Sequence, residues 1–101
     1  MIDYKKCKYE WDTEKNLLNI KKHRISFVEA KTAFYDEDAV ILEDIKHTTY
    51  DETRLYAIGM SEKSRLLLVC HCIRSENTIR IISARRAGPD WAQIYEDGGS
   101  L

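Results

Sequence analysis

The second half of the chain contains three consecutive segments with the composition of β-strands, residues 54–61, 65–73 and 78–84. The links between them, Glu62–Ser64 and Arg74–Asn77, are short and polar, and connections of this length suit β-hairpins. The middle segment contains the uninterrupted apolar run Leu66–Cys70, which is typical of a strand buried on both faces. The sequence therefore predicts an antiparallel meander with residues 65–73 at its centre.

The N-terminal segment predicts a strand followed by a helix. Apolar residues and lysines nearly alternate over residues 4–11, which indicates a strand with an exposed lysine face. Asp12 or Thr13 can cap a helix that runs to about His23. We expect its apolar residues to pack and its polar residues to share the other side. The packed set is Trp11, Leu17 and Leu18, and the polar set is Lys15, Asn19, Lys22 and His23.

Ser26 and Glu29 match a capping box, so a second helix is expected to begin at Phe27 and end near Tyr35. A strand over residues 40–45 and a polar loop over residues 46–53 follow. Residues 90–96 predict a short amphipathic helix after Gly88-Pro89.

Composition limits this architecture to one domain over residues 1–101. Hydrophobic residues make up 44% and charged residues 33% of the 101 residues, which suits one compact core. No apolar run approaches the roughly 18 to 20 residues of a membrane span, and the N-terminus is too charged for a signal peptide. The three cysteines are interpreted as reduced thiols, and we expect a cytoplasmic protein. The predicted fold class is α+β: an N-terminal strand and two helices packed on an antiparallel sheet with a meander, then a short C-terminal helix.

Several arginines lie within or just beyond the predicted strands. Strict alternation over residues 78–86 places Arg80 and Arg86 on one face and Arg85 on the other. With Glu52, Arg54 and Arg74 they could converge on one end or face of the sheet. Because the net charge is only −1, any nucleic-acid site must be local.

Such a constellation suits cleavage of RNA without a metal ion. The reaction needs a base for the 2′-hydroxyl, a donor for the leaving 5′-oxygen and cations beside the phosphorane, and arginine can bind two phosphate oxygens at once. Glu52, His23 or Lys22 could move the protons. Spacing alone favours an alternative, in which Glu52 and Arg54 form a surface ion pair and Arg80 extends over the sheet edge.

A metal or cofactor site is not predicted. Alternation sends His71 to the opposite face from Cys70 and Cys72, so the triplet cannot close around one ion. The chain also lacks a glycine-rich phosphate loop, an H-E-x-x-H motif and a serine nucleophile motif.

A series of motifs in this order resembles the BrnT family of bacterial type II toxins, small ribonucleases of RelE-like fold. The resemblance spans roughly residues 9–87. The motifs are Glu10-Trp11-Asp12, Lys22-His23, Ser26–Ala30, Phe34 and the ending Arg80–Arg86.

This resemblance implies a metal-independent ribonuclease that cleaves RNA and inhibits translation. It implies that the catalytic residues are Lys22, His23, Glu52, Arg54, Arg80 and Arg85, and that Arg74 and Arg86 bind RNA. It also implies a BrnA-like antitoxin that neutralises the toxin in a heterotetramer of two toxins and two antitoxins. Operator DNA would be bound only through the antitoxin.

The near-neutral net charge and the altered turn after Lys22-His23 favour an alternative, a non-catalytic interaction module with the same fold. Arg24 follows Lys-His where glycine is usual, although a left-handed helix end suits glycine better. The segment Gly88–Trp91 is also less basic than in many relatives. A DNA-binding protein acting alone is not expected, because the chain has no recognisable recognition helix.

Overall fold

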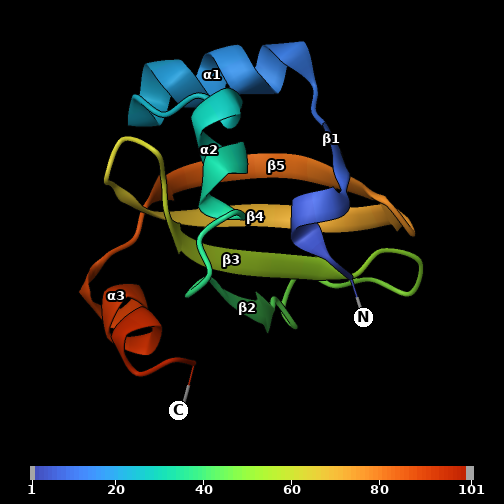
Figure 1. The fold of residues 1–101 in the computed structure, drawn as a ribbon. Helices are drawn as coiled ribbons and strands as arrows, with labels where there is room; N and C mark the ends of the chain where they lie inside the picture. Colours follow the sequence, from blue (N-terminus) through green and yellow to red (C-terminus); the bar gives the residue numbers. More distant parts are fainter. Residues whose placement is uncertain (1, 100–101) are drawn as a thin grey trace.

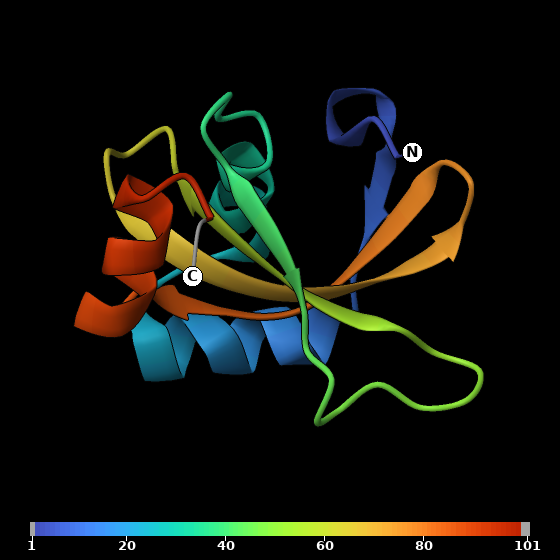
Figure 2. The same ribbon diagram turned by 90° about the horizontal axis from the view of Figure 1, so that it is seen from below.

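A computed structural model describes residues 2–99 as a five-stranded sheet with the strand order β1-β5-β4-β3-β2. Helix α2 lies across one face of the sheet, α1 packs beside β5 and α3 packs against β3 (Figures 1 and 2). The elements in chain order are η1 (Tyr4–Lys6), β1 (Lys8–Glu10), α1 (Thr13–His23), α2 (Phe27–Ala33), β2 (Val40–Glu43), β3 (Arg54–Met60), β4 (Leu66–Ser75), β5 (Thr78–Arg86) and α3 (Pro89–Glu96). The predicted α+β class is confirmed. No helix among residues 2–99 is long and apolar enough to span a membrane.

Asp12 and Ser26 cap their helices as predicted, but the Glu29 carboxylate binds Arg65 and Ser61 instead of completing the capping box. The side chain of Asp12 accepts a hydrogen bond from the Lys15 amide at 3.0 Å, and the Ser26 hydroxyl accepts one from the Glu29 amide at 3.0 Å. These bonds satisfy amides that have no partner within the helix. Helix α1 therefore begins and ends as predicted, whereas α2 ends at Ala33, slightly earlier than expected.

The meander is confirmed, since β2 to β5 pair antiparallel in sequence order. The N-terminal strand differs from the prediction, because residues 4–6 form a 3-10 turn that Asp3 caps. The remaining strand β1 pairs with β5 in parallel, so the sheet is mixed rather than wholly antiparallel. The connection from β1 to β5 contains α1, α2 and the antiparallel strands β2 to β4, so β5 starts at the same end of the sheet as β1.

The core lies mainly between α2 and the sheet. Its sheet side consists of buried residues from β3, β4 and β5, namely Ala57, Leu67, Val69, Ile79, Ile81 and Ala84. We call this side of the sheet the α2 face. A smaller cluster on the opposite side joins Ile58 and Leu68 to Trp91, Ile94 and Tyr95 of α3. We call that side the α3 face.

Helix α1 contradicts the predicted distribution of its side chains. Leu17 and Leu18 are 60% and 64% exposed, whereas Asn19 is buried. The Asn19 amide donates to the Ala84 carbonyl at 2.8 Å, and its carbonyl accepts from the Ala84 amide at 3.1 Å. The Asn19 side chain thus forms hydrogen bonds with the amide and carbonyl of Ala84, a part of β5 with which β1 does not pair. Hydropathy alone cannot predict this, because the buried group is polar and pairs with a residue far along the chain.

His71 is a fully buried residue of β4 on the α2 face. Its Nδ1 lies 3.3 Å from the Val69 carbonyl oxygen and its Nε2 lies 3.0 Å from the Tyr4 hydroxyl. Because a carbonyl only accepts, Nδ1 carries the proton and the Tyr4 hydroxyl donates to Nε2. Burial lowers the pKa of His71 to about 4, so the imidazole is neutral in the folded protein.

The protein is expected to lose stability as the pH falls from about 7.5 to about 5. In the unfolded chain His71 binds a proton near its ordinary pKa, whereas the folded protein resists protonation down to a pKa of about 4. This difference lowers the free energy of unfolding by about 2 kcal/mol over that interval. Urea unfolding at both pH values measures it. A His71→Gln variant should show a smaller pH dependence, and an unchanged dependence would exclude the buried imidazole as its cause.

Candidate active site

A β-bulge at Ile82 determines which arginines of β5 share a face of the sheet. The pairing of β5 with β4 shifts by one residue there, so strict alternation ends. Arg80 lies opposite Cys72 of β4, and Arg85 lies opposite Leu68. Cys72 and Leu68 are four residues apart in one strand, so their side chains point to the same side of the sheet. That side is the α3 face.

The bulge contradicts the predicted grouping of the arginines. Strict alternation places Arg80 with Arg86 and opposite Arg85. In the structure Arg80 and Arg85 share the α3 face, and Arg86 pairs with Leu67 on the α2 face. A bulge of one residue leaves no plain signal in an apolar run such as Ile81-Ile82, so alternation could not foresee it.

A row of cross-strand neighbours connects three strands on the α3 face. Arg54 of β3 lies opposite Cys72 of β4, which in turn lies opposite Arg80 of β5. The Cys72 side chain between the arginines is buried. This row sets the guanidinium groups of Arg54 and Arg80 on one side of the sheet.

Glu52 holds two of the predicted arginines. Its carboxylate lies 2.5 Å from Nε of Arg54 and 3.8 Å from Nη1 of Arg74. The hydrogen bond to Glu52 is the main reason that the pKa of Arg54 is raised. Arg74 belongs to β4 rather than to the hairpin loop where the sequence placed it, because β4 extends to Ser75. The predicted ion pair of Glu52 and Arg54 is therefore present, and it lies next to the arginine row.

A pocket of about 230 Å³ lies on the α3 face beside this cluster. Arg54 and Arg85 line it together, and among residues 2–99 Arg85 has no carboxylate within salt-bridge distance. The remaining lining residues are Asp44, His47, Tyr56, Leu68, Cys70, Ile82 and Ser83. The pocket therefore combines one paired and one unpaired guanidinium group with several polar side chains.

Asp44 and His47 form a pair at one side of this pocket. Asp44 is buried, and its Oδ2 lies 2.8 Å from Nδ1 of the exposed His47. Burial alone would raise the pKa of Asp44, but hydrogen bonds from His47 and Tyr56 outweigh it and lower the pKa. Burial, followed by the hydrogen bond to Asp44, raises the pKa of Tyr56. Asp44 is thus an ionised group that orients His47.

Asp44, His47 and Tyr56 are pocket residues that were not predicted from the sequence. Tyr56 follows Arg54 by two positions in one strand, and this spacing was a usable signal for a shared face. Asp44 and His47 offered no comparable signal. They belong to the segment after β2, and only the turn from Asp44 to His47 brings them to the pocket.

Lys22 and His23 lie at the end of α1, beside β5. They line a second pocket of about 190 Å³, which shares Ile82 and Ser83 with the first. The two pockets are therefore neighbours across the bulged segment of β5. The two predicted residues border the arginine-lined pocket without lining it.

Arg24 has the left-handed conformation that the family pattern assigns to glycine, with φ 61° and ψ 30°. Its amide donates to the Ile20 carbonyl at 2.8 Å, and its carbonyl accepts from Nη2 of Arg65 at 3.1 Å. A side chain in this region costs about 1 kcal/mol. The hydrogen bond from Arg65 offsets part of this cost, so Lys22 and His23 keep the helix end that glycine would give them.

Arg80 has a partner that was not predicted from the sequence. Its Nη1 lies 2.7 Å from Oε2 of Glu10, which is its cross-strand neighbour on β1. Parallel pairing of β1 and β5 creates this contact between residues far apart in the sequence. Arg80 therefore stands at the end of the arginine row with its charge partly balanced.

Residues 2–99 contain no cluster of His, Cys, Asp and Glu side chains that could hold a metal ion. His71 packs in the core on the α2 face, whereas Cys70 and Cys72 belong to the α3 face. The separation that alternation predicts for this triplet is present.

Comparisons with a protein-family model and with a solved structure point to the same family. Residues 11–90 match a family model described as the ribonuclease toxin BrnT of type II toxin-antitoxin systems. The chain is also similar to the crystal structure of the Brucella abortus ribonuclease toxin BrnT, with a TM-score of 0.62 and 26% sequence identity. That match covers 81% of this chain and 97% of the Brucella chain. No curated protein sequence gives a significant match.

Proposed function

The chain belongs to the BrnT family of ribonuclease toxins of type II toxin-antitoxin systems, and we propose that it cleaves RNA at the arginine-lined pocket of the α3 face without a metal ion. The observation that carries this location is the meeting of Arg54 and Arg85 in one pocket. Glu52 holds Arg54 at 2.5 Å, so this guanidinium is fixed before RNA binds. Arg85 has no such partner among the described residues and can bind a phosphate directly.

The arginines would stabilise the transition state by their charge. The 2′-oxygen attacks phosphorus, the bond from phosphorus to the 5′-oxygen breaks, and the products are a 2′,3′-cyclic phosphate and a 5′-hydroxyl. The phosphorane carries more charge on its oxygens than the ground state does, so fixed cations lower the barrier. Arg54 and Arg85 contact the scissile phosphate in this arrangement, and Arg80 and Arg74 extend the site to flanking phosphates.

His47 is the group best placed to move a proton in this pocket. Asp44 holds Nδ1 of the imidazole, which leaves Nε2 to face the substrate. The base takes a proton from the 2′-hydroxyl, and an acid gives one to the leaving 5′-oxygen. Glu52 is a positioning residue in this arrangement, because its carboxylate is shared by two arginines. Lys22 and His23 border the pocket across Ser83 and are the alternative proton carriers.

The toxin class also implies an RNA substrate and an antitoxin partner. We propose that RNA cleavage inhibits translation in the cytoplasm and that a BrnA-like antitoxin neutralises the protein as a heterotetramer of two toxins and two antitoxins. Operator DNA would be bound only through the antitoxin.

Incubation of the purified protein with total cellular RNA in EDTA tests the proposed activity. We expect fragments with 2′,3′-cyclic phosphate ends from the wild type and a strong loss of them from folded Arg80→Ala and Glu52→Ala variants. His47→Gln, His23→Gln and Lys22→Ala, compared over a range of pH, should separate the three candidate proton carriers. The variant of the true carrier should lose the corresponding limb of the pH profile.

Intact RNA from the folded wild type would contradict direct cleavage. Addition of ribosomes then distinguishes a ribosome-dependent ribonuclease from a non-catalytic interaction module. Cleavage that EDTA abolishes would instead contradict the metal-independent mechanism.

A further inference from the structure

The two edges of the sheet differ in how many of their outward main-chain groups are hydrogen-bonded. Beside β5, the side-chain amide of Asn19 forms hydrogen bonds with both the amide and the carbonyl of Ala84. The other edge is β2, the last strand in the sheet order. Among residues 2–99 no side chain or main-chain group forms a hydrogen bond with the outer side of β2. An edge of this kind can accept an additional strand.

The register shows which groups of β2 face outward. The Asp44 amide donates to the Arg54 carbonyl at 2.8 Å, so Asp44 belongs to a hydrogen-bonded pair with β3. Such pairs alternate along an antiparallel ladder, and Leu42 and Val40 therefore also bond to β3. The amides and carbonyls of Ile41 and Glu43 consequently point away from the sheet.

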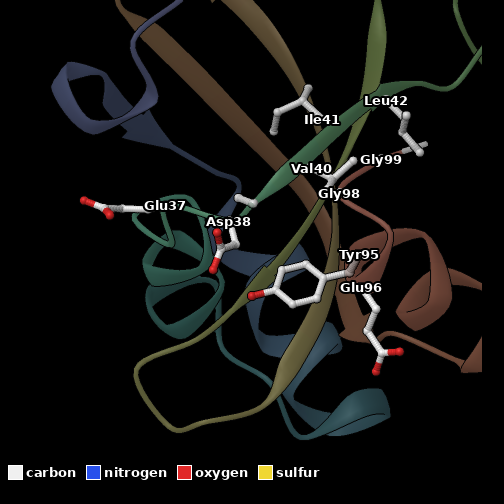
Figure 3. Close-up of a pocket in the computed structure, with 10 residues that line it drawn as sticks. Glu37, Asp38, Val40, Ile41, Leu42, Tyr95, Glu96, Gly98 and Gly99 are labelled. Atoms are coloured by element: carbon white, nitrogen blue, oxygen red, sulfur yellow. The ribbon is translucent and has the colours of Figure 1, made fainter.

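Two pockets lie on either side of this edge. The pocket on the α3 side has a volume of about 760 Å³ and lies between β2 and the end of α3, with Tyr95 and Glu96 beside the strand (Figure 3). The pocket on the α2 side has a volume of about 530 Å³ and an apolar floor formed by Ile2, Tyr4, Phe34 and Ile41. Its charged lining residues are Asp3, Lys5, Asp36 and Glu37, of which Lys5 and Glu37 form an ion pair at 3.5 Å. Successive side chains of an added strand point to opposite faces, so they would enter these two pockets in turn.

The charge around the edge indicates which side chains would fit. Three carboxylates, those of Glu37, Asp38 and Glu96, line the α3-side pocket, and no lysine or arginine lines it. Glu43 adds an acidic side chain on the strand itself, on the α2 side that it shares with Ile41. A second copy of this chain would bring like charges together at the edge, which disfavours self-pairing. Basic side chains are favoured instead.

We propose that the outer edge of β2 binds an extended segment of a partner protein in which basic and aliphatic residues alternate. The segment adds a sixth strand through the main-chain groups of Ile41 and Glu43. Its lysines or arginines enter the acidic pocket and its aliphatic side chains enter the pocket formed by Tyr4, Phe34 and Ile41. This binding site does not depend on the proposed RNA cleavage, because no arginine of the α3-face site lines either pocket.

A peptide of about seven residues in which lysine and valine alternate serves as the probe. Titration of the full-length protein, followed by amide chemical shifts, should show the largest changes at Ile41 and Glu43. A peptide with glutamate in place of lysine should bind at least about tenfold more weakly. Asp38→Asn with Glu96→Gln should also weaken binding of the lysine peptide, and the remaining affinity should depend less on salt.

Two N-methylated peptides test the strand addition itself. Methyl groups on the valine amides block one set of donors, and methyl groups on the lysine amides block the other. Only one set faces β2, so one methylated peptide should lose binding and the other should retain it. Equal binding by the two would overturn the proposal, as would the absence of shifts at Ile41 and Glu43.

Glu43→Pro provides the matching change in the protein. It removes an outward amide without touching the ladder to β3, as edge strands tolerate. Glu43→Thr removes the same charge but keeps the amide. We expect Glu43→Pro to weaken peptide binding at least about tenfold relative to Glu43→Thr, with circular dichroism confirming that both fold. Wild-type affinity in Glu43→Pro, or a wild-type dimer that only Glu43→Pro dissociates, would overturn the proposed partner.

Discussion

Replacement of Arg65 by alanine is expected to lower the melting temperature by about 10 to 20 °C, the largest stability effect that we expect from a single polar side chain. Glu29 is 2% exposed, and its carboxylate accepts hydrogen bonds from Nε of Arg65 at 2.9 Å and from the Ser61 hydroxyl at 2.7 Å. The hydrogen bonds from Arg65 are the main reason that the pKa of Glu29 is lowered. Without Arg65 the carboxylate keeps one donor in a buried position, where an unpaired charge is costly.

Thermal unfolding of Arg65→Ala and Glu29→Gln, singly and together, tests this account. The double variant should melt above Arg65→Ala, because a neutral amide costs less to bury than an unpaired carboxylate. Arg74→Ala is the matched control. Arg74 is 51% exposed and lies 3.8 Å from Glu52, so its loss should change the melting temperature by less than about 4 °C. A similar small change in Arg65→Ala would show that water or a neighbouring group replaces the guanidinium.

Local chemistry made the helices and hairpins predictable from the sequence. Asp12 and Ser26 are N-caps whose partners lie three residues ahead, so the sequence alone contains both members of each contact. The hairpins from β3 to β5 are likewise defined by short polar links between apolar runs. The parallel pairing of β1 was not predictable in this way, because it depends on where two helices return the chain.

The two faces of helix α1 could not be predicted from hydropathy alone. Leu17 and Leu18 are exposed and Asn19 is buried, because the free main-chain groups of Ala84 require a donor and an acceptor that only a polar side chain can supply. The contact joins residues separated by 65 positions in the sequence. A helical pattern cannot reveal that the adjacent sheet edge needs such a partner.

The candidate site was predictable only in part. Glu52 and Arg54 are two positions apart, and the structure pairs them as the spacing indicated. Alternation grouped Arg80 with Arg86, but the bulge at Ile82 places Arg85 on the same face as Arg80 and Arg86 on the opposite face. The position of a bulge depends on how two strands pair, so it cannot be predicted from the sequence of one strand alone.

Arg85→Ala is expected to lower kcat/KM for RNA cleavage about 10- to 150-fold in the proposed ribonuclease mechanism. Arg85 lines the same pocket as Arg54, and the described residues place no carboxylate within ion-pair distance of it. Its charge is therefore available to the phosphate, and contacts that strengthen in the transition state reduce kcat as well as kcat/KM when removed. Stability should change little, because the side chain is exposed.

Arg86→Ala is the control that makes this prediction specific. The two substitutions remove the same charge from adjacent residues, but Arg85 faces the α3 pocket and Arg86 lies on the α2 face. If the active site lies on the α3 face, the cleavage rate of Arg86→Ala should stay within about threefold of the wild-type rate. This substitution then weakens only the long-range electrostatic attraction between the protein and RNA. Arg85→Lys should recover part of the loss, because lysine keeps the charge but cannot bind two phosphate oxygens in the same plane. Equal losses in the two alanine variants would mean that RNA responds to the total charge of the strand end, and the pocket would then not be the catalytic centre.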